Sequence, residues 1–178
     1  RGYAGQVAGG VLKPGDEVVV LPSGLTTTIA KIESSGVEVD VAYPPMSVTV
    51  HLRDDVDVSR GDMICRPNNR ASVSQDIDAM VCWMGDKPLT PKGRYAIKHT
   101  TRNARCVVQE LQYRLDVNTL HREEGIPQLG LNDIGRVRMR TTAPLFHDSY
   151  RRNRTTGSFI LIDEATNATV GAGMLLGQ

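Results

Sequence analysis

The sequence contains few of the side chains that build metal sites and disulfide frameworks. Three cysteines occur in 178 residues, at Cys65, Cys82 and Cys106, and no two of them form a C-x-x-C pair. Any intrachain pairing would leave one cysteine unpaired, which argues against a disulfide framework or a zinc site. The four histidines are scattered and have no cysteine at ligand spacing. We therefore expect no metal ligands in this chain.

Aromatic residues and excess charge are also scarce. Two Phe and one Trp leave few rings on which single-stranded bases could stack. The 21 Lys and Arg residues nearly balance the 20 Asp and Glu residues, so no net field attracts nucleic acid or an acidic membrane. No apolar run reaches the roughly 18 residues that span a bilayer, and no signal peptide opens the chain. These absences predict a cytoplasmic protein that binds neither membranes nor nucleic acid.

Helical periodicity is missing as well. No segment keeps the 3.6-residue spacing of apolar side chains over the roughly ten residues of an ordinary helix. Instead, about a dozen short segments alternate apolar and polar residues, at spacings of about 8 to 12 residues. A polar stretch at 69–75 separates two sets of them. The pattern predicts an all-β chain of two consecutive antiparallel β-barrels, 1–68 and 76–178, with 69–75 as a linker.

Local patterns also predict turns and strand faces. Lys13-Pro14-Gly15-Asp16 fits a type II turn, which needs a positive φ at Gly15. The strand expected at 106–117 is long enough that it should bend or carry a bulge. Its alternation should place one set of side chains on a single face: Val107, Leu111, Tyr113, Leu115 and Val117. The segment 120–129 is the one place where a short helical turn is expected. Two sets of side chains should point into the cores: Val48, Val50 and Leu52 in the first domain, and Ile77, Ala79, Val81 and Trp83 in the second.

The most regular stretch lies near the end of the sequence, at 153–174. Ser158 to Ile162 is a short apolar strand, 163–167 supplies turn formers, and 168–175 is a return strand of small residues. The two strands should pair antiparallel and close the second barrel. We expect Gly171 and Gly173 to permit close approach of the neighbouring strand. The hairpin carries no group suited to catalysis.

The candidate functional residues are arginines. On 135–141, Val137, Met139 and Thr141 should face inward, which turns every second side chain, all arginine, to the outside. More arginines follow soon after, and this cluster can meet a polyanion or an acidic protein partner. The alternative is that charged side chains simply keep the outer face of a strand solvated. The candidate interface residues are Arg136, Arg138, Arg140, Arg151, Arg152 and Arg154.

Catalytic patterns are weak. His147, Asp148 and Ser149 include the three residue types of a hydrolase triad, but neighbours in sequence do not converge as a triad must. We expect no catalytic residues here. No G-x-x-x-x-G-K-[ST] loop or Asn-Lys-x-Asp motif occurs, so this chain should not bind GTP by itself.

Four stretches carry a family resemblance: RGYAGQVAGGVLKPGDEVVVLPSG at 1–24, DAMVCWM at 78–84, YRLDVNTL at 113–120 and TNATVGAGM at 166–174. Together they resemble the large GTPase subunits of bacterial ATP sulfurylase, a branch of the elongation-factor-Tu-like GTPases. The resemblance covers essentially the whole chain. It implies the second and third domains of such a subunit, both β-barrels, which agrees with the reading of the strand pattern.

The resemblance also implies a reaction and partners. The intact complex couples GTP hydrolysis to the formation of adenosine 5′-phosphosulfate from ATP and sulfate, on a separate catalytic subunit. The resemblance places GTP and magnesium on a GTPase domain. We expect this chain to lack that domain and also the first strand of the first barrel. Some family members continue into an adenylylsulfate kinase. The barrels would relay the state of the GTPase domain and dock the catalytic subunit.

Two other functions stay open. A barrel pair of this type can instead belong to a translation elongation factor and bind tRNA, which predicts salt-dependent RNA binding. An independent β-barrel enzyme is the third interpretation, and it requires a pocket with converging titratable groups.

Overall fold

A computed structural model of the protein describes residues 1–177. These residues form thirteen β-strands and no helix, and they divide into two compact units, 1–71 and from Ser72 onward. The prediction of an all-β chain with two antiparallel barrels is confirmed. The division between units falls inside the predicted linker, at 71/72.

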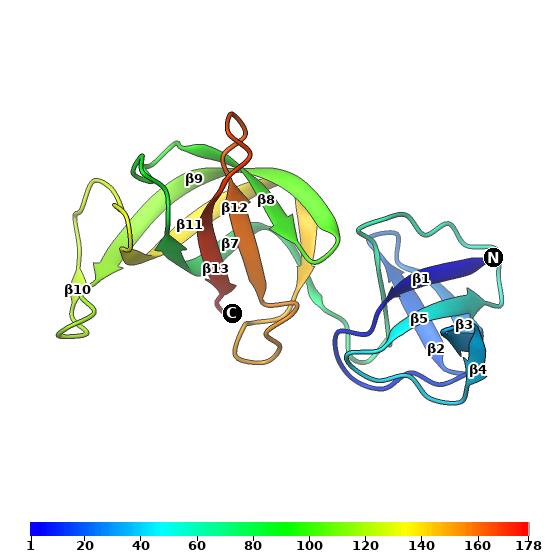
Figure 1. Cartoon of the computed structure of the whole chain (residues 1–178). Helices are drawn as coiled ribbons and strands as arrows, with labels where there is room; N and C mark the ends of the chain where they lie inside the picture. Colours follow the sequence, from blue (N-terminus) through cyan, green and yellow to red (C-terminus); the bar gives the residue numbers. More distant parts are fainter. Residues whose placement is uncertain (178) are drawn as a thin grey trace. The chain divides into compact units, whose positions relative to one another are not determined.

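The first unit is a six-stranded antiparallel sheet wrapped around its own core (Figure 1). The strand order is β1-β5-β3-β2-β6, and β4 pairs with β3. The side chains of Val48, Val50 and Leu52 are buried, as the alternation predicts. The strands are β1 (Gly2–Gln6), β2 (Glu17–Leu21), β3 (Leu25–Ser34), β4 (Val37–Val39), β5 (Ser47–Leu52) and β6 (Met63–Cys65).

The predicted turn before β2 is present. The backbone N–H of Asp16 donates to the carbonyl of Lys13 over 3.1 Å, and Gly15 has a φ of 92°. A left-handed φ at this position strains any residue with a Cβ, which explains why glycine stands there.

The second unit is a closed barrel. Its strands pair in the order β9-β11-β7-β13-β12-β8, and a further ladder between β8 and β9 completes the ring. The short strand β10 pairs only with the end of β9, outside the ring, on the arm visible in Figure 1. The strands are β7 (Ser72–Trp83), β8 (Arg94–His99), β9 (Arg102–Leu115), β10 (Arg122–Glu123), β11 (Ile134–His147), β12 (Ser158–Ile162) and β13 (Thr169–Leu175).

Strand β7 begins inside the segment that the sequence presents as linker. Residues Ser72, Val73 and Ser74 pair with the end of β11, from His147 to Leu145. The polarity of these residues hides the extension from sequence reading. The β11 residues that pair with them lie more than 70 positions away, beyond the reach of any local pattern. Further along β7, the predicted inward set Ile77, Ala79, Val81 and Trp83 is buried.

The long strand β9 carries the predicted irregularity. Its register against β11 shifts twice, skipping Gln112 and Gln109. Each skipped residue reverses which side chains face inward. Val108 and Leu111 therefore lie in the core. Tyr113 and Leu115 instead pair with residues of β11 that face outward, so they face outward as well. A simple alternation would have placed Leu111, Tyr113 and Leu115 on one face, and that expectation is wrong.

The segment 116–133 contains no helix, contrary to the helical turn expected at 120–129. Its backbone forms turns, and Arg122 and Glu123 pair with Leu115 and Arg114. Pairing with the end of β9 satisfies backbone groups that a short, glycine- and proline-interrupted helix would leave exposed.

The terminal hairpin forms as predicted. β12 and β13 pair antiparallel, and β13 continues the ring through β7. A Cβ built on Gly173 would lie 2.1 Å from a ring carbon of Phe159, so the inner side of β13 is filled by the ring of its hairpin partner. The expected close approach at Gly173 is confirmed.

Candidate protein interface

The three arginines of β11 lie on the outer side of the second barrel. Their neighbours Val137, Met139 and Thr141 are buried, as expected. Arg138 and Arg140 are exposed, and Arg136 is half-buried. Strand alternation alone produces this arrangement.

Each of these arginines has a carboxylate partner on an adjacent strand. Arg136 contacts Asp78 over 2.6 Å, and Arg140 contacts Asp76 over 2.8 Å, both across to β7. Arg138 turns to the other side, where Glu110 of β9 lies 3.3 Å away. We call these three pairs the arginine ladder. Sequence reading found the arginines but missed the ladder, because its acidic partners are 28 to 64 positions away.

The ladder neutralises its own charge. Asp78 holds the Arg136 guanidinium through Nε and Nη2 and raises the pKa of Arg136. Ion pairs at a protein surface contribute about 0 to 1 kcal/mol each to stability. The outer face of β11 therefore offers paired charges, which are weaker attractors for a polyanion than three unpaired arginines would be.

Arg151, Arg152 and Arg154 lie in a different element, the loop between β11 and β12. All three are exposed, and the Arg154 guanidinium lies 6.0 Å from the centre of the Tyr150 ring. The side-chain oxygen of Asn153 accepts the backbone N–H groups of Thr155 and Thr156. The six predicted residues thus occupy two places, a strand face and a loop.

A buried polar cluster that sequence reading missed anchors this loop. His99 Nε2 donates to the carbonyl of Thr156 over 2.7 Å, and the Thr156 hydroxyl donates to Asp148. His147 Nε2 lies 2.7 Å from the hydroxyl of Ser74. His147 and Asp148 therefore bind different partners, and neither hydrogen bond involves Ser149.

The surroundings of the two histidines disfavour their charged forms. Burial lowers the pKa of His99, although the hydrogen bond to Thr156 acts in the opposite direction. Burial also lowers the pKa of His147, and the nearby His99 lowers it further. The sequence places His99 within an expected strand, where a packing or hydrogen-bonding histidine is the more common outcome, but no local pattern marks His147 as its neighbour.

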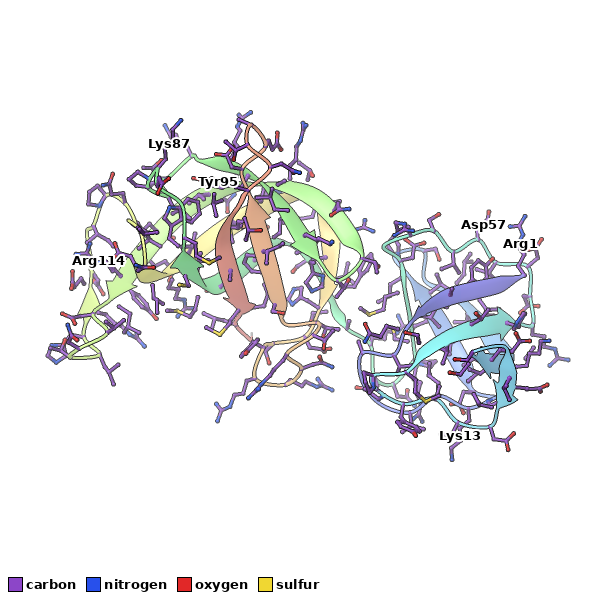
Figure 2. All side chains as sticks on the ribbon, viewed as in Figure 1. Arg1, Lys13, Asp57, Lys87, Tyr95 and Arg114 are labelled. Carbon is purple, nitrogen blue, oxygen red and sulfur yellow. The ribbon has the colours of Figure 1, made fainter. Side chains whose placement is uncertain are left out.

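Two hollows mark the second unit. The larger, open and about 580 Å³, is bordered by the ion pair of Arg105 and Glu164, by the middle of β8 and by the end of β12. The smaller, about 230 Å³, lies where Arg114 meets Glu123 and Asp133, beside the β10 arm (Arg114 is labelled in Figure 2). Within residues 1–177, no three metal-binding side chains gather at one point. The same residues include no helix suited to crossing a membrane.

Comparison with known protein families identifies the second barrel. The family described as GTP-eEF1A C-terminal domain-like matches residues 76–176, more than half of the chain. The chain belongs to this family. Solved structures show the same fold over both units: Sup35 complexed with GDP superposes with a TM-score of 0.87, at 18% identity, over 99% of this chain and 45% of that one.

Curated relatives match the chain over nearly its whole length. It is 55% identical over 177 residues to the "Bifunctional enzyme CysN/CysC" of Mycobacterium tuberculosis, covering 99% of this chain and 29% of that protein. It is 42% identical over 176 residues to "Sulfate adenylyltransferase subunit 1" of Bacteroides fragilis, covering 99% and 37%. The resemblance to sulfurylase GTPase subunits is therefore confirmed. The chain spans about a third of the length of these relatives.

Proposed function

We propose that this chain is the two-barrel part of a GTPase subunit of sulfate adenylyltransferase. The observation that carries this proposal is 42% identity along 99% of the chain to a relative named sulfate adenylyltransferase subunit 1. The family-specific stretches 78–84 and 113–120 lie on β7 and at the end of β9, so they belong to the barrel itself and its arm.

In this proposal the chemistry takes place elsewhere in the complex. The catalytic subunit transfers AMP from ATP to sulfate, and GTP hydrolysis drives the transfer. This chain has no phosphate-binding loop, so the proposal does not place GTP and its magnesium on it. They are assigned to a GTPase domain outside residues 1–178, and the complex to the cytoplasm.

The barrels have two roles in the proposal: they relay the state of the GTPase domain, and they dock the catalytic subunit. Two units, each with its own core, can transmit movement as rigid bodies. The relatives named "subunit 1" imply that a further subunit exists in their complexes. Some relatives are named as bifunctional enzymes, which favours a kinase fused to the same polypeptide.

A pull-down with the catalytic subunit tests the docking role. The triple variant Arg138→Glu, Arg140→Glu, Arg152→Glu should weaken capture if the arginines contact that subunit. The matched control is the exchange Arg140→Asp with Asp76→Arg, which keeps an ion pair across β7 and β11 but moves the cation. Unchanged capture of the triple variant removes the arginines from the interface. Failure of the wild-type subunit to bind contradicts the docking role itself.

A translation role is the second candidate, because the matched family is named for eEF1A and the fold matches Sup35. It requires phosphate contacts, which make binding strongly salt-dependent. The paired charges of the arginine ladder weigh against it. A gel shift with tRNA at low salt distinguishes the two: RNA binding that falls steeply with salt would favour the translation role.

A further inference from the structure

The outer face of the second barrel carries an apolar row that crosses five strands in register. Pairing places Ile160 opposite Ala172, Ala172 opposite Cys82, Cys82 opposite Ile134, and Ile134 opposite Leu115. The row therefore runs over β12, β13, β7, β11 and β9. The flanking residues of these strands, such as Leu161, Val81 and Gly135, are buried on the inner side. The row itself must face outward.

A second row runs parallel to the first, at the next outward-facing position of each strand. Met174 of β13 lies opposite Met80 of β7, and Met80 lies opposite Arg136, which lies opposite Tyr113. The Tyr113 hydroxyl contacts the Met80 sulfur at 3.7 Å, and Met174 is 40% exposed. We call the two rows the apolar belt: Ile160, Ala172, Cys82, Ile134, Leu115, Met174, Met80 and Tyr113.

An outward sheet face that is apolar across five strands is unusual, because the solvated face of an antiparallel sheet normally carries polar side chains. At a strand spacing of about 4.8 Å the belt spans roughly 20 Å. That width suits the apolar centre of a protein interface, which typically buries about 800 Å² on each partner. Methionines adapt readily to an opposing surface.

The charges beside the belt restrict what can cover it. Arg136 reaches over to Asp78, and the other two pairs of the arginine ladder continue from there along the same strands. These pairs leave no excess of either sign along this edge. Lys98 lies opposite Ile160 at one end of the first row, and Arg122 lies opposite Leu115 at the other, so the two ends add two positive charges. The Arg122 guanidinium lies 4.8 Å from the centre of the Tyr113 ring. A polyanion gains little from such a surface. A partner face that is apolar at its centre and carries acidic side chains opposite Lys98 and Arg122 complements this surface best.

We propose that the apolar belt is the docking face for a folded protein partner whose own contact surface is apolar at its centre and acidic where it meets Lys98 and Arg122. The inference rests on the proposed function, in which that partner is the catalytic subunit. The arginine ladder then forms the polar rim of the interface, outside its apolar centre.

The test uses the complete GTPase subunit that carries this chain, with the purified catalytic subunit as the probe. Met80→Glu combined with Met174→Glu places two carboxylates at the centre of the belt and should raise the Kd at least about 30-fold, as loss of a central anchor does. Ala172→Arg is a second variant, which obstructs the face from an exposed position without removing an apolar side chain. The matched control is Leu25→Glu with Val37→Glu, two exposed apolar residues of the first unit.

Protection of Cys82 from alkylation supplies a readout without mutation. The partner should shield Cys82 and leave the labelling of Cys65, on the first unit, unchanged. If the wild-type subunit binds and both belt variants bind with the same affinity, the inference is wrong and the proposed function stands. If the wild-type subunit does not bind the catalytic subunit, the docking role in the proposed function is wrong, and the inference about the belt fails with it. If the belt variants instead abolish self-association of the subunit, the occupant is a second copy and the proposed partner is wrong.

Discussion

Single residues in the second barrel are set by close approach between strands. Gly173 is the sharpest case, because the ring of Phe159 occupies the space that a side chain would need. Gly171 is less confined: its nearest neighbours to an added Cβ, on Leu161 and Trp83, lie 3.3 Å away. The requirement for glycine therefore differs along the same strand.

Replacing Gly173 by alanine should displace the Phe159 ring and destabilise the barrel by about 1 to 3 kcal/mol, the usual cost of overpacking. Urea unfolding followed by the fluorescence of Trp83 measures the change. Gly171→Ala should cost less, and Gly5→Ala, with open space around its position on β1, is the control. Equal stability of the Gly173 and Gly5 variants would contradict the packing seen here.

The buried histidines give the barrel a dependence on pH. Burial lowers the pKa of both His99 and His147 in the folded protein, so the unfolded chain binds protons more readily. The stability that the neutral imidazoles contribute is therefore fully present above pH 6.5 and is lost as the pH falls toward the lowered folded-state pKa values. Asp148 opposes this trend, because its charge favours the protonated forms.

We predict that the melting temperature decreases as the pH is lowered from 7.5 to 5.5. His99→Gln with His147→Gln should flatten this part of the profile, because both titrating groups are gone. His121→Gln, on an exposed residue of the β10 arm, is the control and should leave the slope unchanged. A profile that stays as steep in the double histidine variant would assign the pH dependence to other groups.

At the scale of elements, the start of β7 decides where the second domain begins. The polarity of 69–75 predicts a linker, and the matched family also begins at 76. In the structure, Ser72 to Ser74 instead complete the ladder with β11, and Ser74 contacts His147. A strand end with few apolar side chains can still be held by backbone pairing.

Two fragments measure what this strand end contributes. The fragment 72–178 contains the closed ring and its core, so it should unfold cooperatively on its own. The fragment 76–178 loses the pairing with 145–147 and the partner of His147, and we expect a lower melting temperature. The control is the longer fragment with Ser74→Ala, which keeps the strand pairing and loses only the side-chain hydrogen bond to His147. Identical melting of 72–178 and 76–178 would show that residues 72–75 act only as a linker.

At the scale of the whole molecule, two units with separate cores carry their surfaces independently. The second unit holds the arginine ladder, the loop with Arg151, Arg152 and Arg154, and the apolar belt, and it is also the part that the family match covers. Similarity to the curated relatives extends over the first unit as well. The family match and the similarity to the relatives therefore cover different extents of the chain, the second unit alone and both units.

The sequence by itself determined the strand pattern, the turn at Gly15, the terminal hairpin and the buried faces around Val48 and Ile77. These follow from alternation and turn chemistry, which act over a few neighbouring residues. Only the tertiary structure decided that Arg136 pairs with Asp78, that two skipped residues turn Tyr113 outward, and that Met80 meets Met174. Such contacts depend on register between strands far apart in the chain, and register is set by how the whole barrel closes.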